Sequence, residues 1–347
     1  MKSFLFKDAV LSICIFLLIG TSVFVLNSIA PFLFPSYFIY IVLGLFILWF
    51  FSQIGFEVVT LFSKHLYVIS LILLLITLII GQVTRGTIRW IPIGSLSFQP
   101  AEIVRPFLLV FFAHYLTQGE MTFKRLRNAA LLLLLPTFLI LVQPSLGVSI
   151  LTVIGFVGVL FAADFNKKYI LAGVVGILLL IPIFWLVMQP YQRQRVMTFV
   201  NPQSDPLGAG YNSIQSQVAV GAGKFSGRGL GKGVQTQLAF LPEKQTDFIF
   251  AATSEELGFI GSSLLIVGTF LILWRFTVFM EHSTSPAARA YLSGFFLTYF
   301  AQACVHIGMN LGLLPITGLP LPLVSAGGSS FLATMLGLGI ALGAYKK

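Results

Sequence analysis

Charged side chains within apolar stretches are the first candidates for chemistry in this sequence. Glu102 and Arg105 stand three residues apart, just after Gln99 and Pro100, a pair that favours the start of a helix. At this spacing two side chains face each other on a helix. We expect them either to form a buried ion pair that holds neighbouring helices in register or to place charge beside a cavity for an anionic substrate. Buried ionisable groups are costly and usually functional, so both alternatives stay open.

A second group of charges lies further along the chain. Glu243 and Asp247 are four residues apart at the start of an apolar run, so helical geometry would place both carboxylates on one face. The alternative is that a helix N-terminus favours acids electrostatically, without a catalytic duty. Glu255 and Glu256 would lie about 12 Å further along the same helix, deeper in the apolar run. Each of these two then needs a partner or a proton.

Residues 221–233 alternate glycine with Lys224, Arg228 and Lys232. Glycines let backbone amides approach an anion, and the cations would neutralise it. The stretch lacks the spacing of a Walker loop and does not join a strand to a helix in a nucleotide-binding unit. An anion site and a flexible hinge are therefore both open interpretations.

The remaining chemistry-bearing residues are isolated. Arg89 and Trp90 suit a membrane interface, where a guanidinium and an indole anchor a helix end. The histidines and cysteines show neither metal-ligand spacing nor a disulfide framework, and we expect packing or surface roles for them; they are His65, His114, His282, His306, Cys14 and Cys304.

The amino-acid composition indicates whether water or lipid surrounds this chain. Of its 347 residues, 57% are hydrophobic and 9% are charged, which leaves too little polar surface to cover a soluble core. The net charge of +10 comes from cations scattered singly between apolar segments, which fits membrane topology and argues against nucleic acid as a partner. We therefore predict an integral membrane protein, with membrane lipid as its surroundings.

A spanning helix needs about 20 mostly apolar residues to cross about 30 Å of hydrocarbon. The sequence predicts an all-α polytopic protein of about ten transmembrane helices, with a long extracytoplasmic loop at about 189–246 between the seventh and the eighth. Residues 1–347 are expected to form a single transmembrane domain. The predicted spans lie near 8–30, 36–54, 65–81, 99–116, 128–143, 146–163, 168–188, 248–274, 287–311 and 321–344.

The distribution of cations predicts the orientation. With the N-terminus inside, the cytoplasmic segments hold twelve Lys and Arg residues, the short outer loops hold Arg85 and Arg89, and the long outer loop holds six. The positive-inside rule thus places both termini in the cytoplasm. The polar outer segments 82–105, 189–247 and 312–330 are where function is to be sought.

Four ordered motifs carry a family resemblance. They are RWIPIGSLSFQPAEIVRP at 89–106, RVMTFVNPQSDPLGAGYNSIQSQVAVGAG at 195–223, LPEKQTDFIFAATSEELGFIG at 241–261 and GMNLGLLPITGLPLPLVSAGGSS at 308–330. With them the sequence resembles the SEDS family, the group of RodA, FtsW and SpoVE, over nearly its whole length. The motif GLLPITGLPLP is more similar to that of the RodA, elongation-type branch.

The resemblance implies a peptidoglycan glycosyltransferase in the bacterial cytoplasmic membrane. It would join lipid II units into glycan strands on the outer face, with a class B penicillin-binding protein as the crosslinking partner. Asp247 matches the catalytic position of the family, and Glu243, Trp90, Glu102 and Arg105 match other positions implicated in function. The sequence departs from the family at Ser145, where Asp is usual, at Gln245, where His is common, and at His306, which occupies an Asn-like position.

A mechanism follows for such a substrate. The sugar leaves as a lipid diphosphate, which needs no protonating acid, so one carboxylate can suffice. Asp247 is expected to act as general base on the acceptor hydroxyl. Arg193, Arg195 or Lys244, or a divalent cation such as Mg²⁺ or Mn²⁺, would stabilise the departing diphosphate, and no organic cofactor is expected.

Two rival functions remain. A lipid II flippase could use intramembrane charges, among them Glu102, Arg105, Glu255 and Glu256, to line a path across the bilayer. A non-catalytic scaffold that only positions the penicillin-binding protein is suggested by Ser145. The intact TDFIF segment argues against the scaffold.

Overall fold

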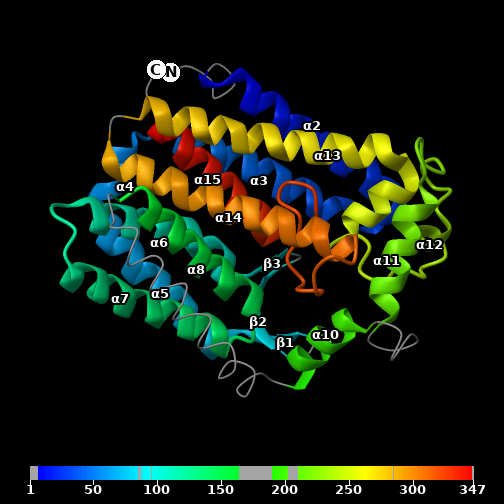
Figure 1. Cartoon of the computed structure of the whole chain (residues 1–347), viewed down its shortest axis with the longest axis horizontal. Helices are drawn as coiled ribbons and strands as arrows, with labels where there is room; N and C mark the ends of the chain where they lie inside the picture. Colours follow the sequence, from blue (N-terminus) through cyan, green and yellow to red (C-terminus); the bar gives the residue numbers. More distant parts are fainter. Residues whose placement is uncertain are drawn as a thin grey trace.

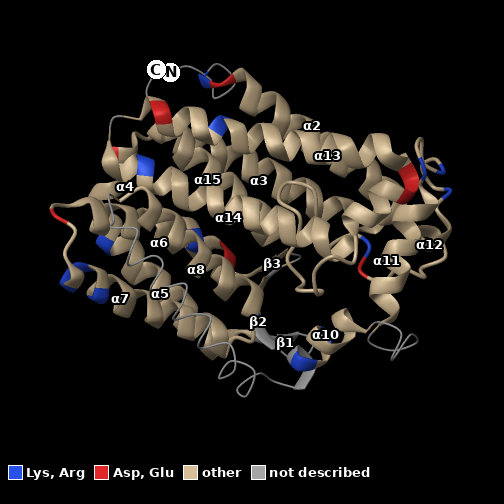
Figure 2. Cartoon of the chain, in the orientation of Figure 1, with Lys and Arg blue, Asp and Glu red and all other residues tan. Residues whose placement is uncertain are grey.

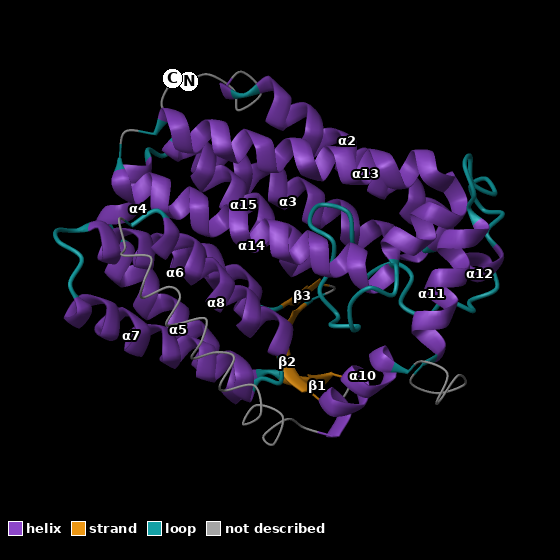
Figure 3. Ribbon diagram, in the orientation of Figure 1, coloured by secondary structure: helices purple, strands orange, loops and turns teal. Residues whose placement is uncertain are grey.

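The structure, a computed structural model, describes residues 7–84, 87–94, 96–163, 190–201, 210–283 and 285–345. Long helices dominate it, with three short strands (Figures 1 and 3). The long helices are α2 (Ala9–Ile29), α3 (Phe34–Gln53), α5 (Ser63–Ile80), α6 (Pro100–Thr117), α7 (Phe123–Val142), α8 (Leu146–Phe161), α13 (Ile249–His282), α14 (Pro286–Asn310) and α15 (Gly328–Ala344). The shorter ones are η1 (Pro31–Leu33), α4 (Phe56–Leu61), α10 (Pro190–Val200), α11 (Tyr211–Ala222) and α12 (Val234–Gln237).

Nine of the ten predicted spans coincide with these nine long helices. Among the described residues, six helices are long and apolar enough to cross a membrane, when η1 and α3 are taken as one. The helices α8 and α15 are apolar but shorter, and α6 carries two charged residues. The predicted seventh span, 168–188, lies outside the described residues.

The helices pack around α15, all 17 residues of which are buried. This helix lies against α3 and α6, while α14 packs on α8 and α13 packs on α2. Large apolar side chains stay exposed along α2, α3, α5 and α7, as lipid-facing surfaces require; examples are Phe24, Val42, Ile79 and Phe138. The sequence reaches a packed interior with few charges because its helices are apolar on both their inner and outer faces.

A small antiparallel sheet connects α5 to α6. It consists of β1 (Gln82–Thr84), β2 (Thr87–Ile93) and β3 (Leu96–Phe98), in the order β1-β2-β3. The hydroxyl of Tyr40 fixes β3 to α3, because it donates to the carbonyl of Ser97 at 2.7 Å and accepts from the amide of Ser97 at 2.9 Å.

The predicted inner and outer segments separate onto two sides of the bundle. At one end Arg275 of α13 pairs with Asp8 at the start of α2, and Tyr345 stacks on Phe279 with 4.6 Å between ring centroids. Figure 1 places α4 and the turn from α6 to α7 at this left-hand end, and α10, α11, α12 and the strands away from it. Figure 2 shows Lys and Arg residues at the start of α7 and near α4, with a further group beside α12.

Helix α13 is broken at Gly258, which adopts φ 66° and ψ −157°. Only glycine adopts this conformation readily. The glycine-rich stretch from Gly223 to Gly231 fills the break and satisfies backbone groups on both sides of it. Its bonds are Arg228 N to Glu255 O at 2.9 Å, Gly229 N to Glu256 O at 3.0 Å and Phe259 N to Lys224 O at 2.9 Å. Residues 248–274 therefore do not form the uninterrupted span that the sequence predicts.

Glu255 and Glu256 have the partners that the sequence predicts they need. Both side chains are fully buried, and both lie against α12. The carboxylate of Glu255 accepts from the amides of Gln235 and Thr236 at 2.8 and 2.9 Å, so it caps the start of α12. Oε1 of Glu256 accepts from the hydroxyl of Ser28 at 2.7 Å.

The glycine-rich stretch binds a carboxyl group that belongs to the protein itself. The amide of Gly231 donates to Oε1 of Glu256 at 3.2 Å, whereas Lys224, Arg228 and Lys232 are exposed. From the sequence, residues 221–233 could form either an anion site or a flexible hinge. In the structure the stretch holds two helical pieces together through backbone bonds, and its cations face solvent.

We expect Gly258→Ala to destabilise the protein. A Cβ at this position would lie 2.2 Å from N of Gly227 and 2.6 Å from O of Phe225, and the positive φ adds strain of about 1–3 kcal/mol. The thermal midpoint of the purified protein should fall. Gly20→Ala is the control, since Gly20 lies in α2 with no atom within 4 Å of an added Cβ. Equal midpoints for the two variants would contradict the strain.

Candidate functional site

Asp247 lies in a turn that precedes α13. The helix begins at Ile249 with Phe248 as its N-cap, and residues 242–248 form turns. Glu243 adopts a positive φ of 50°, so the predicted helical face shared by Glu243 and Asp247 does not form. The amide of Asp247 still donates to the carbonyl of Glu243 at 3.0 Å, which keeps both residues in one tight turn. The Asp247 side chain is half-buried.

The segment between α14 and α15 lies opposite the Asp247 carboxylate. A Cβ added to Gly318, which has φ 72°, would be 3.7 Å from Oδ2 of Asp247. The backbone of this segment therefore approaches the carboxylate closely. The acid is thus enclosed between its own turn and a glycine-containing loop, and it keeps some exposure to solvent.

The three predicted cations differ in their surroundings. Nζ of Lys244 donates to the carbonyl of Thr236 at the start of α12. Burial lowers the pKa of Lys244, and the nearby carboxylates of Glu256 and Glu255 oppose this shift. Lys244 is therefore part of the carboxylate cluster around α12.

Arg193 and Arg195 lie on α10, across from the 314–316 segment. Nη1 of Arg195 donates to the carbonyl of Ile316 at 3.2 Å, and its side chain is exposed. Arg195 lines a groove of about 260 Å³ between α10, α11 and residues 314–316. Polar side chains also line this groove; they are Gln194, Thr198, Asn212 and Ser213. The groove can hold a polar ligand beside a guanidinium.

Glu102 and Arg105 form the predicted ion pair inside α6. Nη2 of Arg105 lies 3.0 Å from Oε2 of Glu102, and both side chains are buried. The same Nη2 donates at 3.0 Å to Gln302 of α14, whose amide donates to the carbonyl of Pro320 at 2.9 Å. The pair thus joins α6, α14 and the loop before α15. Nη1 of Arg105 is buried without a hydrogen-bond partner among the described residues, so the substrate-binding alternative stays a prediction.

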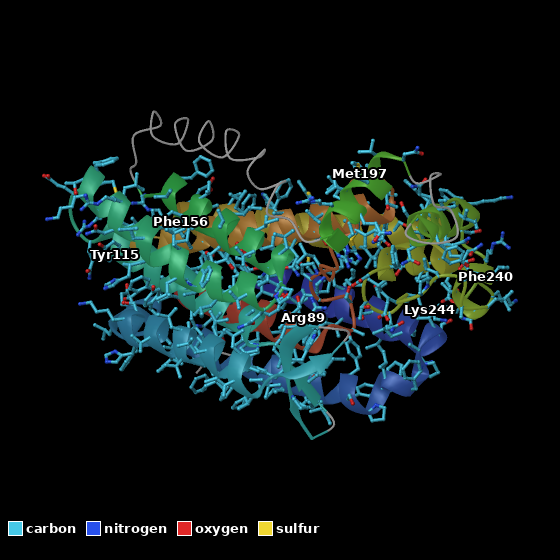
Figure 4. The ribbon with its side chains drawn as sticks, turned by 90° about the horizontal axis from the view of Figure 1, so that it is seen from below. Arg89, Tyr115, Phe156, Met197, Phe240 and Lys244 are labelled. Atoms are coloured by element: carbon cyan, nitrogen blue, oxygen red, sulfur yellow. The ribbon has the colours of Figure 1, made fainter. Side chains whose placement is uncertain are left out.

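Arg89 and Trp90 lie on β2 and are half-buried. Trp90 stands opposite Gln82 in the register of β1 and β2. Figure 4 shows Arg89 on the side of the molecule that carries Met197 of α10 and Lys244, while Tyr115 lies at the opposite end. The interfacial role of Arg89 and Trp90 stays a prediction.

The three residues that depart from the family pattern each form a hydrogen bond with another segment of the chain. Oγ of Ser145, the residue before α8, accepts from the side-chain amide of Gln99 at 3.3 Å. Nδ1 of His306 lies 2.8 Å from the carbonyl of Leu319, to which it donates, so the predicted packing role of this histidine is confirmed. The backbone carbonyl of Gln245 accepts from the amide of Ala326 at 2.9 Å.

Within the described ranges, no group of three or more His, Cys, Asp or Glu residues could hold a metal ion. Glu243 and Asp247 supply two carboxylates in one turn. Mg²⁺ is commonly held by one or two carboxylates together with substrate phosphates.

Comparison with known proteins identifies relatives over most of the chain. The model of the FtsW, RodA and SpoVE family, described as cell cycle protein, matches residues 4–347. Peptidoglycan glycosyltransferase MrdB of Escherichia coli K12 is 39% identical over 305 residues, which are 87% of this chain and 82% of the relative. Probable peptidoglycan glycosyltransferase FtsW of Idiomarina loihiensis is 36% identical over 287 residues, 81% of this chain and 70% of the relative.

Solved structures share the fold. One is a chain from a peptidoglycan synthase complex described as coordinating polymerization and crosslinking, with a TM-score of 0.85, 31% identity and coverage of 96% of both chains. The rod shape determining protein RodA of Thermus thermophilus gives a TM-score of 0.74 at 27% identity and covers 98% of both chains. The residues that the family model matches include the turn of Asp247, both halves of α13 and the loop before α15.

Proposed function

Since the chain belongs to the FtsW, RodA and SpoVE family and is similar to its RodA members, we propose that it polymerises lipid II with Asp247 as general base. The chain is an all-α, multi-pass membrane protein and a peptidoglycan glycosyltransferase of the cell wall. To this the proposal adds lipid II as the substrate, Asp247 as the general base and the outer face of the membrane as the place of reaction. The observation that carries it is the half-buried Asp247 carboxylate, enclosed by its turn and by the Gly318 loop.

The reaction needs one proton acceptor. The acceptor sugar hydroxyl gives its proton to the Asp247 carboxylate, its oxygen forms a bond to the anomeric carbon of the donor, and the bond from that carbon to the lipid diphosphate breaks. The diphosphate departs with the bonding electron pair. A positioned general base contributes about 10²–10⁴-fold to such a step.

We assign the stabilisation of the departing diphosphate to α10. Arg195 lines the groove between α10, α11 and residues 314–316, and Arg193 lies on the same helix. Lys244 instead donates to Thr236 and lies near the carboxylates beside α12. A guanidinium binds phosphate oxygens bidentately, which suits this role. A divalent cation would accompany the substrate diphosphate rather than occupy a protein site.

We further propose the orientation and the partner. The outer side carries α10, α11, α12 and the strands, and the cation-bearing turns with both termini face the cytoplasm. The polyprenyl tail of lipid II lies along the exposed apolar helix surfaces. A class B penicillin-binding protein crosslinks the product, in keeping with the coordinated polymerization and crosslinking of the solved synthase complex.

Product analysis tests this function against its two rivals. Purified protein is mixed with lipid II and Mg²⁺, with and without the cognate penicillin-binding protein, and products are separated on a gel. Long glycan ladders support the polymerase. Absence of glycan under every condition, together with translocation of lipid II in vesicles, would establish the flippase instead. The flippase has lost part of its motivation, because Glu255 and Glu256 bind amides of the protein itself.

Gly318→Ala should slow polymerisation. The positive φ of 72° costs an alanine about 1–2 kcal/mol, so the backbone facing Oδ2 of Asp247 has to move. A displacement of about 1 Å near a reacting group can cost up to about 10²-fold in rate. The initial rate of lipid II consumption measures the effect. Gly221→Ala, in α11 with no atom within 4 Å of the new Cβ, should retain the wild-type rate, and equal rates for both variants would refute the close approach.

A further inference from the structure

Three consecutive backbone carbonyls hold the turn that carries Asp247. Each accepts a hydrogen bond from the last quarter of α14 or from the turn before α15, far away in sequence. The bonds run from Ala326 N to Gln245 O at 2.9 Å, from Ser325 Oγ to Thr246 O at 2.8 Å, and from Asn310 Nδ2 to Asp247 O at 3.0 Å. The turn is thus fixed one residue after another by a separate part of the chain.

Asn310 uses both ends of its side-chain amide. Besides its bond to Asp247, Nδ2 donates to the carbonyl of His306 at 2.8 Å, and Oδ1 accepts from the amide of Ala251 at 3.0 Å. The residue is fully buried at the end of α14. One side chain therefore connects the turn of Asp247, the first turn of α13 and its own helix, and every one of these bonds fixes its orientation.

Ser325 is fixed in the same manner. Its Oγ accepts from the amide of Leu321 at 2.8 Å, so the hydroxyl hydrogen is left to donate to the carbonyl of Thr246. Ser325 is buried. Because α13 begins at Ile249, the helical ladder does not hold Asp247 in place, and the long-range bonds supply that restraint.

We propose that Asn310 and Ser325 are positioning residues for the Asp247 carboxylate. This inference rests on the proposed role of Asp247 as general base. Asn310 holds the backbone carbonyl of Asp247, which is attached to the same Cα as the side chain. The carboxylate carbon is two bonds from that Cα, and Gly318 confines the carboxylate from the other side. A general base acts only within hydrogen-bond reach of the proton that it removes. The hydrogen bonds from Asn310 and Ser325 hold the Asp247 carboxylate within that distance of the acceptor hydroxyl.

Asn310→Asp is the sharpest variant, because it keeps the size of the side chain. One oxygen can still accept from Ala251, but the other replaces Nδ2 and faces the carbonyls of Asp247 and His306. Two acceptors in contact repel, so the turn moves. We expect kcat for lipid II polymerisation to fall by about 10–100-fold while KM for lipid II stays within about threefold.

Ser325→Ala is the second variant and decides the question if Asn310→Asp does not fold. It deletes one hydroxyl that donates to the carbonyl of Thr246, and we expect a loss of about 3–10-fold in kcat. Ser293→Ala is its matched control, since Ser293 of α14 likewise donates a hydroxyl to a carbonyl of another helix, that of Gly158, at 2.7 Å. The control should polymerise at the wild-type rate.

The assay uses the full chain with lipid II, and Asp247→Ala gives the baseline. A fall in kcat at unchanged KM supports positioning. A kcat within twofold of wild type in both Asn310→Asp and Ser325→Ala, with Asp247→Ala inactive, overturns this inference and leaves the proposed function intact. A rise in KM alone also overturns it, since the two residues would then serve substrate binding. An active Asp247→Ala refutes the proposed function itself.

Discussion

Asp247→Asn is expected to reduce the rate of lipid II polymerisation by about 10²–10⁴-fold without unfolding the protein. The carboxamide has the size of the carboxylate but cannot take up the proton of the acceptor hydroxyl. The backbone bonds of the residue, from its amide to Glu243 and from Asn310 to its carbonyl, are unaffected by the change. Gel analysis of glycan products over time measures the rate.

A matched control separates loss of the base from loss of charge. Glu281→Gln removes a carboxylate at the opposite end of α13, where the side chain is exposed, and should leave polymerisation unchanged. Asp247→Glu keeps the carboxylate but moves it by one methylene, and an intermediate rate is expected. Wild-type polymerisation by Asp247→Asn would mean that another group takes the proton.

Hydrophobicity predicted most of the fold, because each crossing of a bilayer requires a long apolar helix that satisfies its own backbone. It could not predict the break in α13. Residues 248–274 are apolar enough to suggest one continuous helix, and the break depends on a loop that reaches Gly258 from more than twenty residues earlier in the chain. A signal was present: Glu255 and Glu256 precede a glycine, and two buried carboxylates are easier to satisfy at a helix end, where loop amides can reach them.

The site was predicted to a smaller extent. Resemblance singled out Asp247, but the residues that hold its turn lie in other segments, and no local spacing connects them. Gln302, His306 and Asn310 follow one another at intervals of four in α14, which puts them on one face of the helix. Such a polar stripe in an otherwise apolar helix indicates contacts with polar backbone, and each of the three binds a carbonyl of another segment or its own helix.

Arg105→Gln is expected to lower the stability of the protein by about 3–5 kcal/mol, since it leaves Glu102 as a buried carboxylate without its cation. The link to Gln302 of α14 is weakened as well. The double variant Glu102→Gln with Arg105→Gln removes both charges and should recover most of this loss, because two neutral amides can still form a hydrogen bond. Thermal midpoints of the three purified proteins test the prediction.

Polymerisation by the double variant decides between the two roles of the pair. Nη2 of Arg105 already serves both Glu102 and Gln302, and both charged side chains are buried, so the pair is engaged in holding α6 against α14. A neutral pair with the same shape should therefore polymerise lipid II at close to the wild-type rate. A double variant that is stable but needs much more lipid II for half-maximal rate would show that Arg105 binds the anionic substrate. Nη1, for which the described part of the chain supplies no hydrogen-bond partner, would then be the atom that does so, because Nη2 is occupied.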